Sequence, residues 1–212
     1  MGKTIEAGII KIFPTEIFSF QCYDQDLICN TLANLKQENW SNIKQSSRCH
    51  QTVSNRLHKN KEYKELYEWF QLCLAGILNH LKLKCDKLQI TLSWANKAFE
   101  SEDLSDHKHP NSYISGVFYL TDSKSRTIFR KYSNWSNFDG NTYVNFNPLK
   151  SPNQFYFHNP KQGQLLIFPS SLSHSVETNK EINERFSISF NAFPSGQIGE
   201  LGSLSGLHIS IK

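Results

Sequence analysis

Residues 185–191 read Arg-Phe-Ser-Ile-Ser-Phe-Asn, a strict alternation of polar and apolar side chains. Because successive side chains of a β-strand point to opposite faces, this alternation predicts a strand. Its polar face would hold Arg185, Ser187, Ser189 and Asn191. That face has two interpretations, which the sequence leaves open. It is either the water-facing side of a surface strand or the lining of a polar interior, where an arginine needs an anionic partner.

The same period of two recurs along the whole chain after Lys87. Short runs with this period are separated by Asn, Asp, Ser, Gly and Pro, which is typical of a β-sandwich or β-barrel. The predicted strands before residue 185 are Leu88–Trp94, Ser112–Leu120, Thr127–Lys131, Thr142–Phe146, Gln154–Phe157 and Gln164–Phe168. The sequence therefore predicts a mainly β fold in its second part.

The first part of the chain is patterned differently. A short strand is expected at Ile9–Phe13, stopped by a proline. Apolar residues at helical spacing follow Asp24, a candidate N-cap, and predict a helix ending near Gln37. A longer stripe from Tyr63 to Leu81 predicts a second helix, to which we assign a scaffold role. Helices first and strands second indicate a β-domain supported by helices, not alternating βαβ units.

Composition limits the class of protein. A length of 212 residues suits one domain, and 38% hydrophobic with 20% charged residues is ordinary for a globular chain. The formal charge of +4 comes from scattered basic residues, so there is no strong signal for nucleic-acid binding. No apolar stretch approaches the roughly 20 residues that span a bilayer. Five cysteines without a C-x-x-C pair favour reduced thiols in a cytoplasm.

Histidines suggest the chemistry. His107 and His109, in the sequence His-Lys-His-Pro, are two residues apart, so on a strand both imidazoles would reach one ion. Many non-haem iron oxygenases use two histidines and a carboxylate, leaving the other metal positions open. Such sites usually read His-x-Asp/Glu followed by a distal histidine, for which His174 is the candidate. Here His109 stands where the carboxylate is expected.

Three hypotheses follow for the third ligand. In the first, which we favour, His107, His109 and His174 bind the ion together. In the second, Asp106 or Asp103 supplies the missing negative charge. In the third, the register shifts so that His109 leads and Asn111 takes the third position.

The chain resembles the 2-oxoglutarate/Fe(II)-dependent oxygenase superfamily, in its prolyl-4-hydroxylase-like branch, and in particular uncharacterised bacterial and phage members with a His-x-His-Pro motif. The stretches that carry the resemblance are Ile12–Thr15, Ser93–Asn96, His107–Pro110, Ser115–Leu120, Gly163–Pro169 with Leu172 and His174, and Arg185–Ser187. Their order and spacing are more specific than any single piece.

The resemblance implies a fold and a division of the chain. The fold would be a double-stranded β-helix, a jelly-roll or cupin-like barrel braced by two N-terminal helices. The whole chain, 1–212, would form a single domain, with residues 1–87 as a helical support region that includes the N-terminal strand and residues 88–212 as the β-barrel core. A bacterial or phage member would work in the cytoplasm, the host's if phage-encoded.

The resemblance also implies the roles of individual residues. His107 and His174 would be metal ligands for Fe(II), with His109 as the third. Arg185, Ser187 and Tyr119 would bind the distal carboxylate of the co-substrate 2-oxoglutarate, and Asn96 would also reach this molecule. No catalytic residue is expected beyond the metal centre.

The implied activity is hydroxylation of a C–H bond with O2, coupled to oxidative decarboxylation of 2-oxoglutarate to succinate. The substrate would be a prolyl or other protein side chain, with a small molecule or a nucleobase as the next choices. Two alternatives stay open. One is a three-histidine dioxygenase that does not use 2-oxoglutarate, and the other is an inactive barrel that serves as a binding module.

Overall fold

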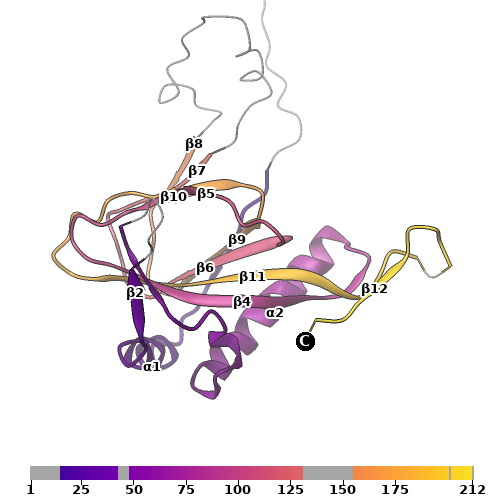
Figure 1. Ribbon diagram of the computed structural model, residues 1–212, viewed down its shortest axis with the longest axis horizontal. Helices are drawn as coiled ribbons and strands as arrows, with labels where there is room; N and C mark the ends of the chain where they lie inside the picture. The colour runs from indigo at the N-terminus through magenta and orange to yellow at the C-terminus, as the bar shows by residue number, and fades with distance from the viewer. Residues whose placement is uncertain (1–14, 43–47, 131–154, 201, 212) are drawn as a thin grey trace, which may run out of the picture.

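The computed structural model describes residues 15–42, 48–130, 155–200 and 202–211 of the chain, which form two antiparallel sheets and two α-helices (Figure 1). The sheets lie one above the other, and both helices lie on the outer side of the larger sheet. The expected strands at 9–13 and 142–146 fall outside the described residues. The mainly β fold with two supporting helices is confirmed, although no hydrogen-bonded ring closes the described strands into a barrel.

The larger sheet has eight strands in the order β1-β9-β6-β11-β4-β3-β2, with β12 paired to β11. The central pair consists of β4 and β11, each 14 residues long. The strand bounds are β1 Phe18–Gln21, β2 Trp40–Asn42, β3 His50–Thr52, β4 Cys85–Ala98, β6 Ile114–Tyr119, β9 Gln164–Pro169, β11 Arg185–Ile198 and β12 Leu207–Ile209.

The smaller sheet has four short strands in the order β5-β10-β7-β8. Their bounds are β5 Leu104–His107, β7 Thr127–Arg130, β8 Phe155–His158 and β10 Ser173–Val176. In the pairing of β10 with β5, His174 lies directly opposite His107. Residues 67 positions apart in the sequence are thus neighbours in this sheet.

The helices begin and end close to the predicted positions. Helix α1, Gln25–Leu35, begins after Asp24, whose carboxylate accepts a hydrogen bond from the backbone N–H of Leu27 at 2.9 Å, as an N-cap should. Helix α2, Lys64–Leu81, follows two short 3-10 turns, η1 Leu57–Lys59 and η2 Lys61–Tyr63. The predicted stripe on α2 is buried through Leu66, Phe70, Leu74 and Ile77.

The main hydrophobic core lies between the helices and the larger sheet. Phe70 of α2 contacts Phe118 of β6 and Phe190 of β11, with ring centroids 5.5 Å and 5.1 Å apart. Gly116 lies directly below the Phe190 ring, and a Cβ there would come within 2.3 Å of it, so the residue type follows from this close approach. The apolar face of β11 therefore packs on the helices.

The polar face of β11 consequently points the other way, toward the smaller sheet. Only a small second cluster of buried hydrophobic residues lies between the sheets: Tyr119, Phe129, Leu166 and Phe168. The rest of this space is a cavity lined by both polar and apolar side chains, including Arg185, Ser187, Ser189 and Asn191 of β11. Of the two interpretations of residues 185–191, the structure thus favours the polar interior.

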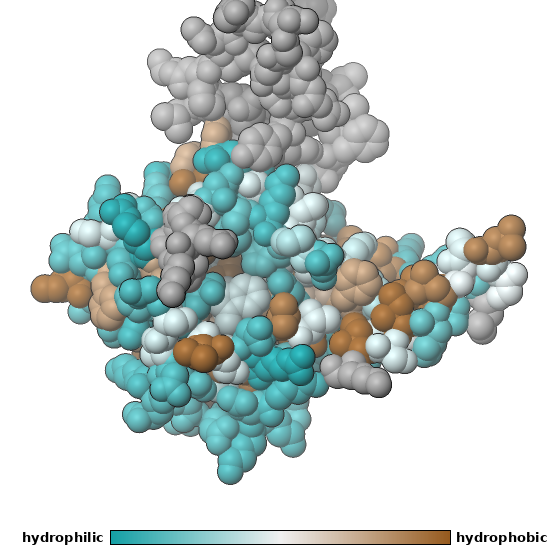
Figure 2. Space-filling view, in the orientation of Figure 1, coloured by the Kyte–Doolittle hydropathy of each residue, from teal (hydrophilic) through white to brown (hydrophobic). Residues whose placement is uncertain are grey.

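Beyond the cavity, the ends of β4 and β11 extend with β12 away from the rest of the molecule (Figure 1). Apolar side chains gather on the surface of this extension (Figure 2), where Leu204 and Leu207 are exposed. Among the described helices, none combines the length and the apolar character needed to cross a membrane.

Candidate metal and co-substrate site

The cavity between the two sheets measures about 490 Å³ and contains all seven of the candidate site residues. These are Asn96, His107, His109, Tyr119, His174, Arg185 and Ser187. Residues from β3, β4, β5, β6, β10 and β11 line its wall, so the fold brings together segments that are far apart in the sequence.

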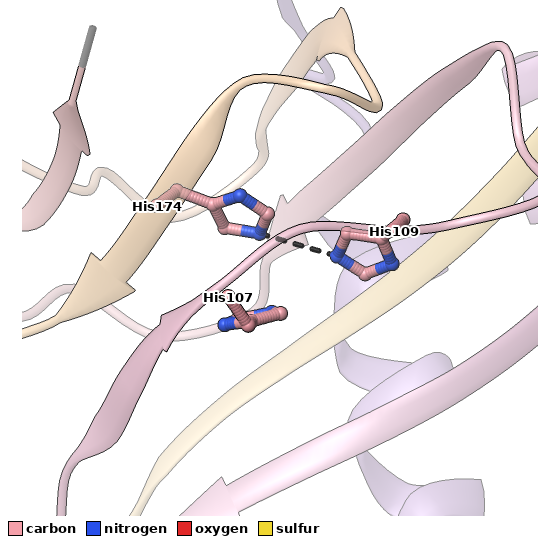
Figure 3. A group of neighbouring side chains, drawn as sticks. All are labelled: His107, His109 and His174. Carbon is pink, nitrogen blue, oxygen red and sulfur yellow. Dashed lines mark hydrogen bonds between the residues drawn. The ribbon is translucent and has the colours of Figure 1, made fainter. Parts of the chain in front are cut away.

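Three histidines converge at one side of the cavity (Figure 3). One ring nitrogen from each of His107, His109 and His174 lies within 4.8 Å of the others, a spacing that suits shared coordination of one ion. His107 ends β5 and His174 lies on β10, while His109 follows in the loop after β5. Among the described residues this is the one group of metal-ligating side chains found.

Backbone carbonyls orient two of these rings. His107 Nδ1 lies 2.8 Å from the carbonyl oxygen of Ser105, and His174 Nδ1 lies 3.0 Å from that of Leu172. Since a carbonyl can only accept, each Nδ1 carries the proton in the neutral ring and leaves Nε2 with a free lone pair. Such a contact fixes the ring and tautomer of a metal-binding histidine. Both rings are thus set to ligate through Nε2.

The third ring is held differently. His109 Nε2 lies 3.2 Å from His174 Nε2, and because the latter is the acceptor, His109 Nε2 carries the proton (Figure 3). Its ring also stacks on Trp94 of β4, with centroids 5.6 Å apart and an interplanar angle of 24°. The backbone N–H of His109 donates to the carbonyl of Ser170 at 3.0 Å. For His109 Nε2 to bind a metal, its proton must move to Nδ1 or leave.

Burial keeps two of these imidazoles, those of His109 and His174, neutral. It lowers the pKa of His174 to about 3 and that of His109 to about 4, with the nearby His107 acting in the same direction. Because metals bind the neutral ring, the two groups are in their ligating charge state throughout the neutral pH range. The donor set therefore fits a divalent transition metal.

The acidic alternatives are engaged elsewhere. The Asp106 carboxylate accepts from Arg130 Nη1 and from Ser173 Oγ, both at 2.9 Å. Asp103 pairs with Arg48 at 3.1 Å. Asn111 has a left-handed backbone with φ of 56° and is not among the residues that line the cavity. The geometry therefore favours the first of the three hypotheses.

Arg185 lies toward the other end of the cavity and is only 9% exposed. Among the described residues its guanidinium makes one hydrogen bond, from Nη1 to the carbonyl of Glu177 at 3.3 Å, and no ion pair. Burial lowers the pKa of this guanidinium, although arginine stays charged in proteins. A buried cation that faces a cavity without a carboxylate partner is suited to an anionic ligand.

Tyr119 and Ser187 lie next to Arg185. They are directly paired across β6 and β11, and Arg185 is two residues from Ser187 on the same face. The Tyr119 hydroxyl lies 2.7 Å from Thr127 Oγ1, and burial raises the pKa of this phenol well above its ordinary value. The phenol therefore stays protonated at neutral pH. These groups lie where they could bind one carboxylate next to the guanidinium, as the sequence predicts.

Asn96 is already bound on both sides. Its Oδ1 accepts from Gln51 Nε2 at 3.1 Å and its Nδ2 donates to Ser189 Oγ at 3.0 Å. One amide proton and one lone pair remain for other contacts. Its contact with the co-substrate stays a prediction.

Sequence reasoning missed several lining residues. Trp94 lies in a stretch that resembles the family, yet nothing in its spacing indicated a stack on His109. Thr127 was expected in a strand, but its bond to Tyr119 depends on how the two sheets face each other. Gln51 falls in a stretch without periodicity, so nothing in the sequence indicated that it would line the cavity.

Residues 92–191, which include the three histidines and Arg185, match a family model described as "Putative 2OG-Fe(II) oxygenase". This segment belongs to the 2OG-Fe(II) oxygenase family. The oxygenase segment covers β4 through the cavity-lining part of β11. No curated protein matches the sequence.

Solved structures with the same fold are distant in sequence. The α-ketoglutarate-dependent epimerase SnoN from nogalamycin biosynthesis superposes with a TM-score of 0.65 at 11% identity, covering 90% of this chain and 83% of its own. A prolyl-4-hydroxylase from Pseudomonas putida gives 0.58 at 12%, covering 86% and 94%. HygX from Streptomyces hygroscopicus, with nickel, 2-oxoglutarate and hygromycin B bound, gives 0.59 at 10%, covering 85% and 83%. These likenesses show that the oxygenase segment sits in a jelly-roll fold.

Proposed function

We propose that the chain is an Fe(II)- and 2-oxoglutarate-dependent dioxygenase that hydroxylates a C–H bond, with a prolyl or other protein side chain as substrate. The observation that carries this proposal is the pairing of two features in one cavity. Three imidazoles converge on one side of the cavity, and a buried arginine with no carboxylate partner among the described residues faces the same space. The first suits the metal and the second suits a dicarboxylic co-substrate.

The cavity residues would have two roles, metal binding and co-substrate binding. His107, His109 and His174 would hold Fe(II), and Arg185, Ser187 and Tyr119 would hold the distal carboxylate of 2-oxoglutarate. When bound, the metal and the co-substrate supply the oxidation, in which substrate R–H, O2 and 2-oxoglutarate give R–OH, succinate and CO2. The chain's own contribution is to orient the reactants and to exclude water. No general base is required of it.

Anaerobic titration of the Fe(II)-loaded protein with 2-oxoglutarate tests the proposal. We expect a saturable visible absorption band, which reports chelation of the keto acid to the metal. In Arg185→Ala the titration should shift to at least about tenfold higher 2-oxoglutarate concentration, because a charge-assisted contact to the carboxylate is lost. Fe(II) affinity should change little in this variant.

Arg56→Ala, which removes an exposed arginine outside the cavity, is the matched control and should titrate like the original protein. An equal titration in Arg185→Ala would contradict the carboxylate site. Bound Fe(II) without any band would instead favour a three-histidine dioxygenase that does not use 2-oxoglutarate. Absence of both Fe(II) binding and the band would favour an inactive binding module.

A further inference from the structure

Four uncharged polar side chains line the face of the cavity that the larger sheet forms. We call Gln51, Asn96, Ser189 and Asn191 the polar wall; they come from β3, β4 and β11 and all line the cavity. Ser189 lies four residues along β11 from Arg185, and Asn191 six residues, so the wall leads away from the proposed carboxylate site. Leu92, opposite Asn191 on β4, is 36% exposed and marks the open end.

The first hydrogen-bond chain of the wall determines what Ser189 offers. Gln51 Nε2 donates to Asn96 Oδ1 at 3.1 Å, and Asn96 Nδ2 donates to Ser189 Oγ at 3.0 Å. Ser189 Oγ is thus already an acceptor, and no acceptor for its own proton is found among the described residues. A hydroxyl has one proton to give. With the Gln51 and Asn96 amides in this orientation, Ser189 presents an O–H donor to the cavity.

The second hydrogen-bond chain lies behind Asn191. The donor in each of its bonds follows from the number of protons that each hydroxyl can give. Ser112 Oγ donates to a backbone carbonyl, that of Ile114 or Ala192, and Ser170 Oγ donates to Ser112 Oγ at 2.8 Å. The single proton of Ser170 is then used. The contact of 2.8 Å between Ser170 and Ser115 must be donated by Ser115.

This count decides the orientation of the Asn191 carboxamide. Ser115 Oγ lies 2.9 Å from the Asn191 side chain. If Asn191 Oδ1 accepted this bond, Ser115 would need a second proton besides the one given to Ser170. Amide oxygen and nitrogen occupy equivalent positions, so the network assigns them. Asn191 Nδ2 donates to Ser115, and Asn191 Oδ1 faces the cavity as an acceptor.

The wall thus offers a donor at Ser189 and an acceptor at Asn191, two residues apart on one face of a strand. That spacing is about 7 Å, and an extended peptide presents its own backbone groups to one side with the same repeat. Trp94 and Leu92 of β4 lie opposite these two residues and give an apolar surface beside them. The pattern of contacts matches a peptide backbone with an apolar side chain.

The charged residues of the cavity narrow the class of substrate further. Apart from the histidines, the charged residues that line the cavity are Arg185 and Asp106, and the Asp106 carboxylate is bound by Arg130 and Ser173. The described part of the open end therefore has no counter-ion for a charged substrate group. Burying an unpaired charge there would be costly.

We propose that the polar wall binds an extended peptide segment whose central residues are uncharged. This rests on the proposed function and names its substrate class. Ser189 and Asn191 act as specificity-determining residues, whereas Gln51, Asn96, Ser112, Ser115 and Ser170 are positioning residues that set which group donates and which accepts.

Binding of capped octapeptide mixtures tests the proposal without relying on turnover. The protein is held with Mn(II) and 2-oxoglutarate, and retained peptides are identified by mass spectrometry. One mixture has uncharged residues at the four central positions, and two others carry Asp or Lys there. We expect the uncharged mixture to be retained at least about tenfold better than either charged mixture, the range expected for one unpaired buried polar group.

Asn191→Asp is the diagnostic variant. A carboxylate at this position should weaken retention of the uncharged mixture about tenfold and favour the Lys mixture over the Asp mixture. Ser189→Ala should weaken retention of the uncharged mixture without favouring either charge. Asn79→Asp, at an exposed position on α2, makes the same chemical change away from the cavity and should behave like the original protein.

The 2-oxoglutarate titration is run on every variant to separate this proposal from the proposed function. Unchanged co-substrate affinity with reversed peptide preference in Asn191→Asp supports the polar wall. Normal co-substrate binding with equal retention of all three mixtures, or displacement of the uncharged mixture by methyl glucoside, overturns the peptide assignment and leaves the dioxygenase intact. A missing 2-oxoglutarate band would count against the dioxygenase instead.

Discussion

The three histidines differ in how their protons are held. His107 and His174 each give the Nδ1 proton to a carbonyl two residues earlier in the chain, that of Ser105 and Leu172. His109 instead stacks on Trp94 and shares its proton with His174. Two rings are therefore prepared for a metal, whereas the third must first give up a hydrogen bond. Because of this difference, His109 is the candidate ligand that can be replaced most readily.

His109→Asp should tighten binding of a divalent metal. Two unit charges about 4 Å apart attract by roughly 4 kcal/mol at an effective dielectric constant of 20, but desolvation of the carboxylate offsets part of this. We expect a net gain of about tenfold in Mn(II) affinity, measured by titration calorimetry. His208→Asp, at an exposed position on β12, is the control. Weaker binding in His109→Asp would mean that the site requires the stacked imidazole.

At this scale the sequence indicates which residues meet, but not their protonation. The pair at positions 107 and 109 follows from side-chain periodicity, and His174 from resemblance. The tautomers depend on carbonyl positions that only the folded backbone defines. Likewise, the orientation of Asn191 depends on Ser112, Ser115 and Ser170, which the fold brings together from two separate segments.

At the scale of elements, the smaller sheet carries two of the candidate ligands on short strands. Asp106 precedes His107 on β5, and Ser173 precedes His174 on β10; the Asp106 carboxylate bonds to Ser173 and to Arg130 of β7. One side chain thus ties three neighbouring strands together next to His107 and His174. We infer that it positions these two histidines relative to each other.

Asp106→Asn should therefore weaken metal binding. Asparagine keeps the shape and can still accept from Ser173, but it loses the charge that holds Arg130. We expect Mn(II) affinity to fall about tenfold, at the lower end of the effect of removing an outer partner of a metal site. The melting temperature without metal should change little, because partly exposed ion pairs contribute under about 1 kcal/mol. Asp26→Asn on α1 is the control, and unchanged affinity in Asp106→Asn would refute this positioning role.

The elements also show why the fold was easier to predict than the site. Periods of two and of 3.6 residues follow from backbone geometry, so both helices and six of the twelve described strands were predicted, whereas the short strands β1, β2, β3, β5, β10 and β12 were missed. The polar face of β11 could not be assigned, because side chains that face water and side chains that line a polar cavity have the same pattern. Only the smaller sheet, lying over this face, decides between them.

At the scale of the whole molecule, three buried or partly buried histidines are kept neutral. Burial lowers the pKa of His58 to about 4, as it does for His109, and that of His174 to about 3. His58 lies outside the cavity, where its Nδ1 accepts a hydrogen bond from the buried Ser93 hydroxyl at 2.8 Å. In the unfolded chain each of these groups titrates near 6.5.

Stability of the metal-free protein should therefore depend on pH. Between about pH 6.5 and pH 4 the unfolded chain binds protons that the folded protein excludes, so the free energy of unfolding should fall as the pH is lowered through this range. Urea denaturation at several pH values measures the slope. In His58→Asn, whose amide oxygen can accept from Ser93, the slope should be shallower. Parallel curves for the two proteins would show that His58 does not contribute.

The register shift opposite Asn191 and Ala192 of β11, where β4 carries the extra residue Thr91, limits where the chain can accept new residues. Up to Asn191 the register with β4 and β6 is continuous, so one residue inserted between Arg185 and Asn191 would turn the following side chains to the opposite face. Beyond the register shift, the strand leaves the cavity and continues into the extension with β12. A fused tag or peptide loop is therefore best placed in the turn between β11 and β12, where a change in length leaves the spacing of the cavity residues intact.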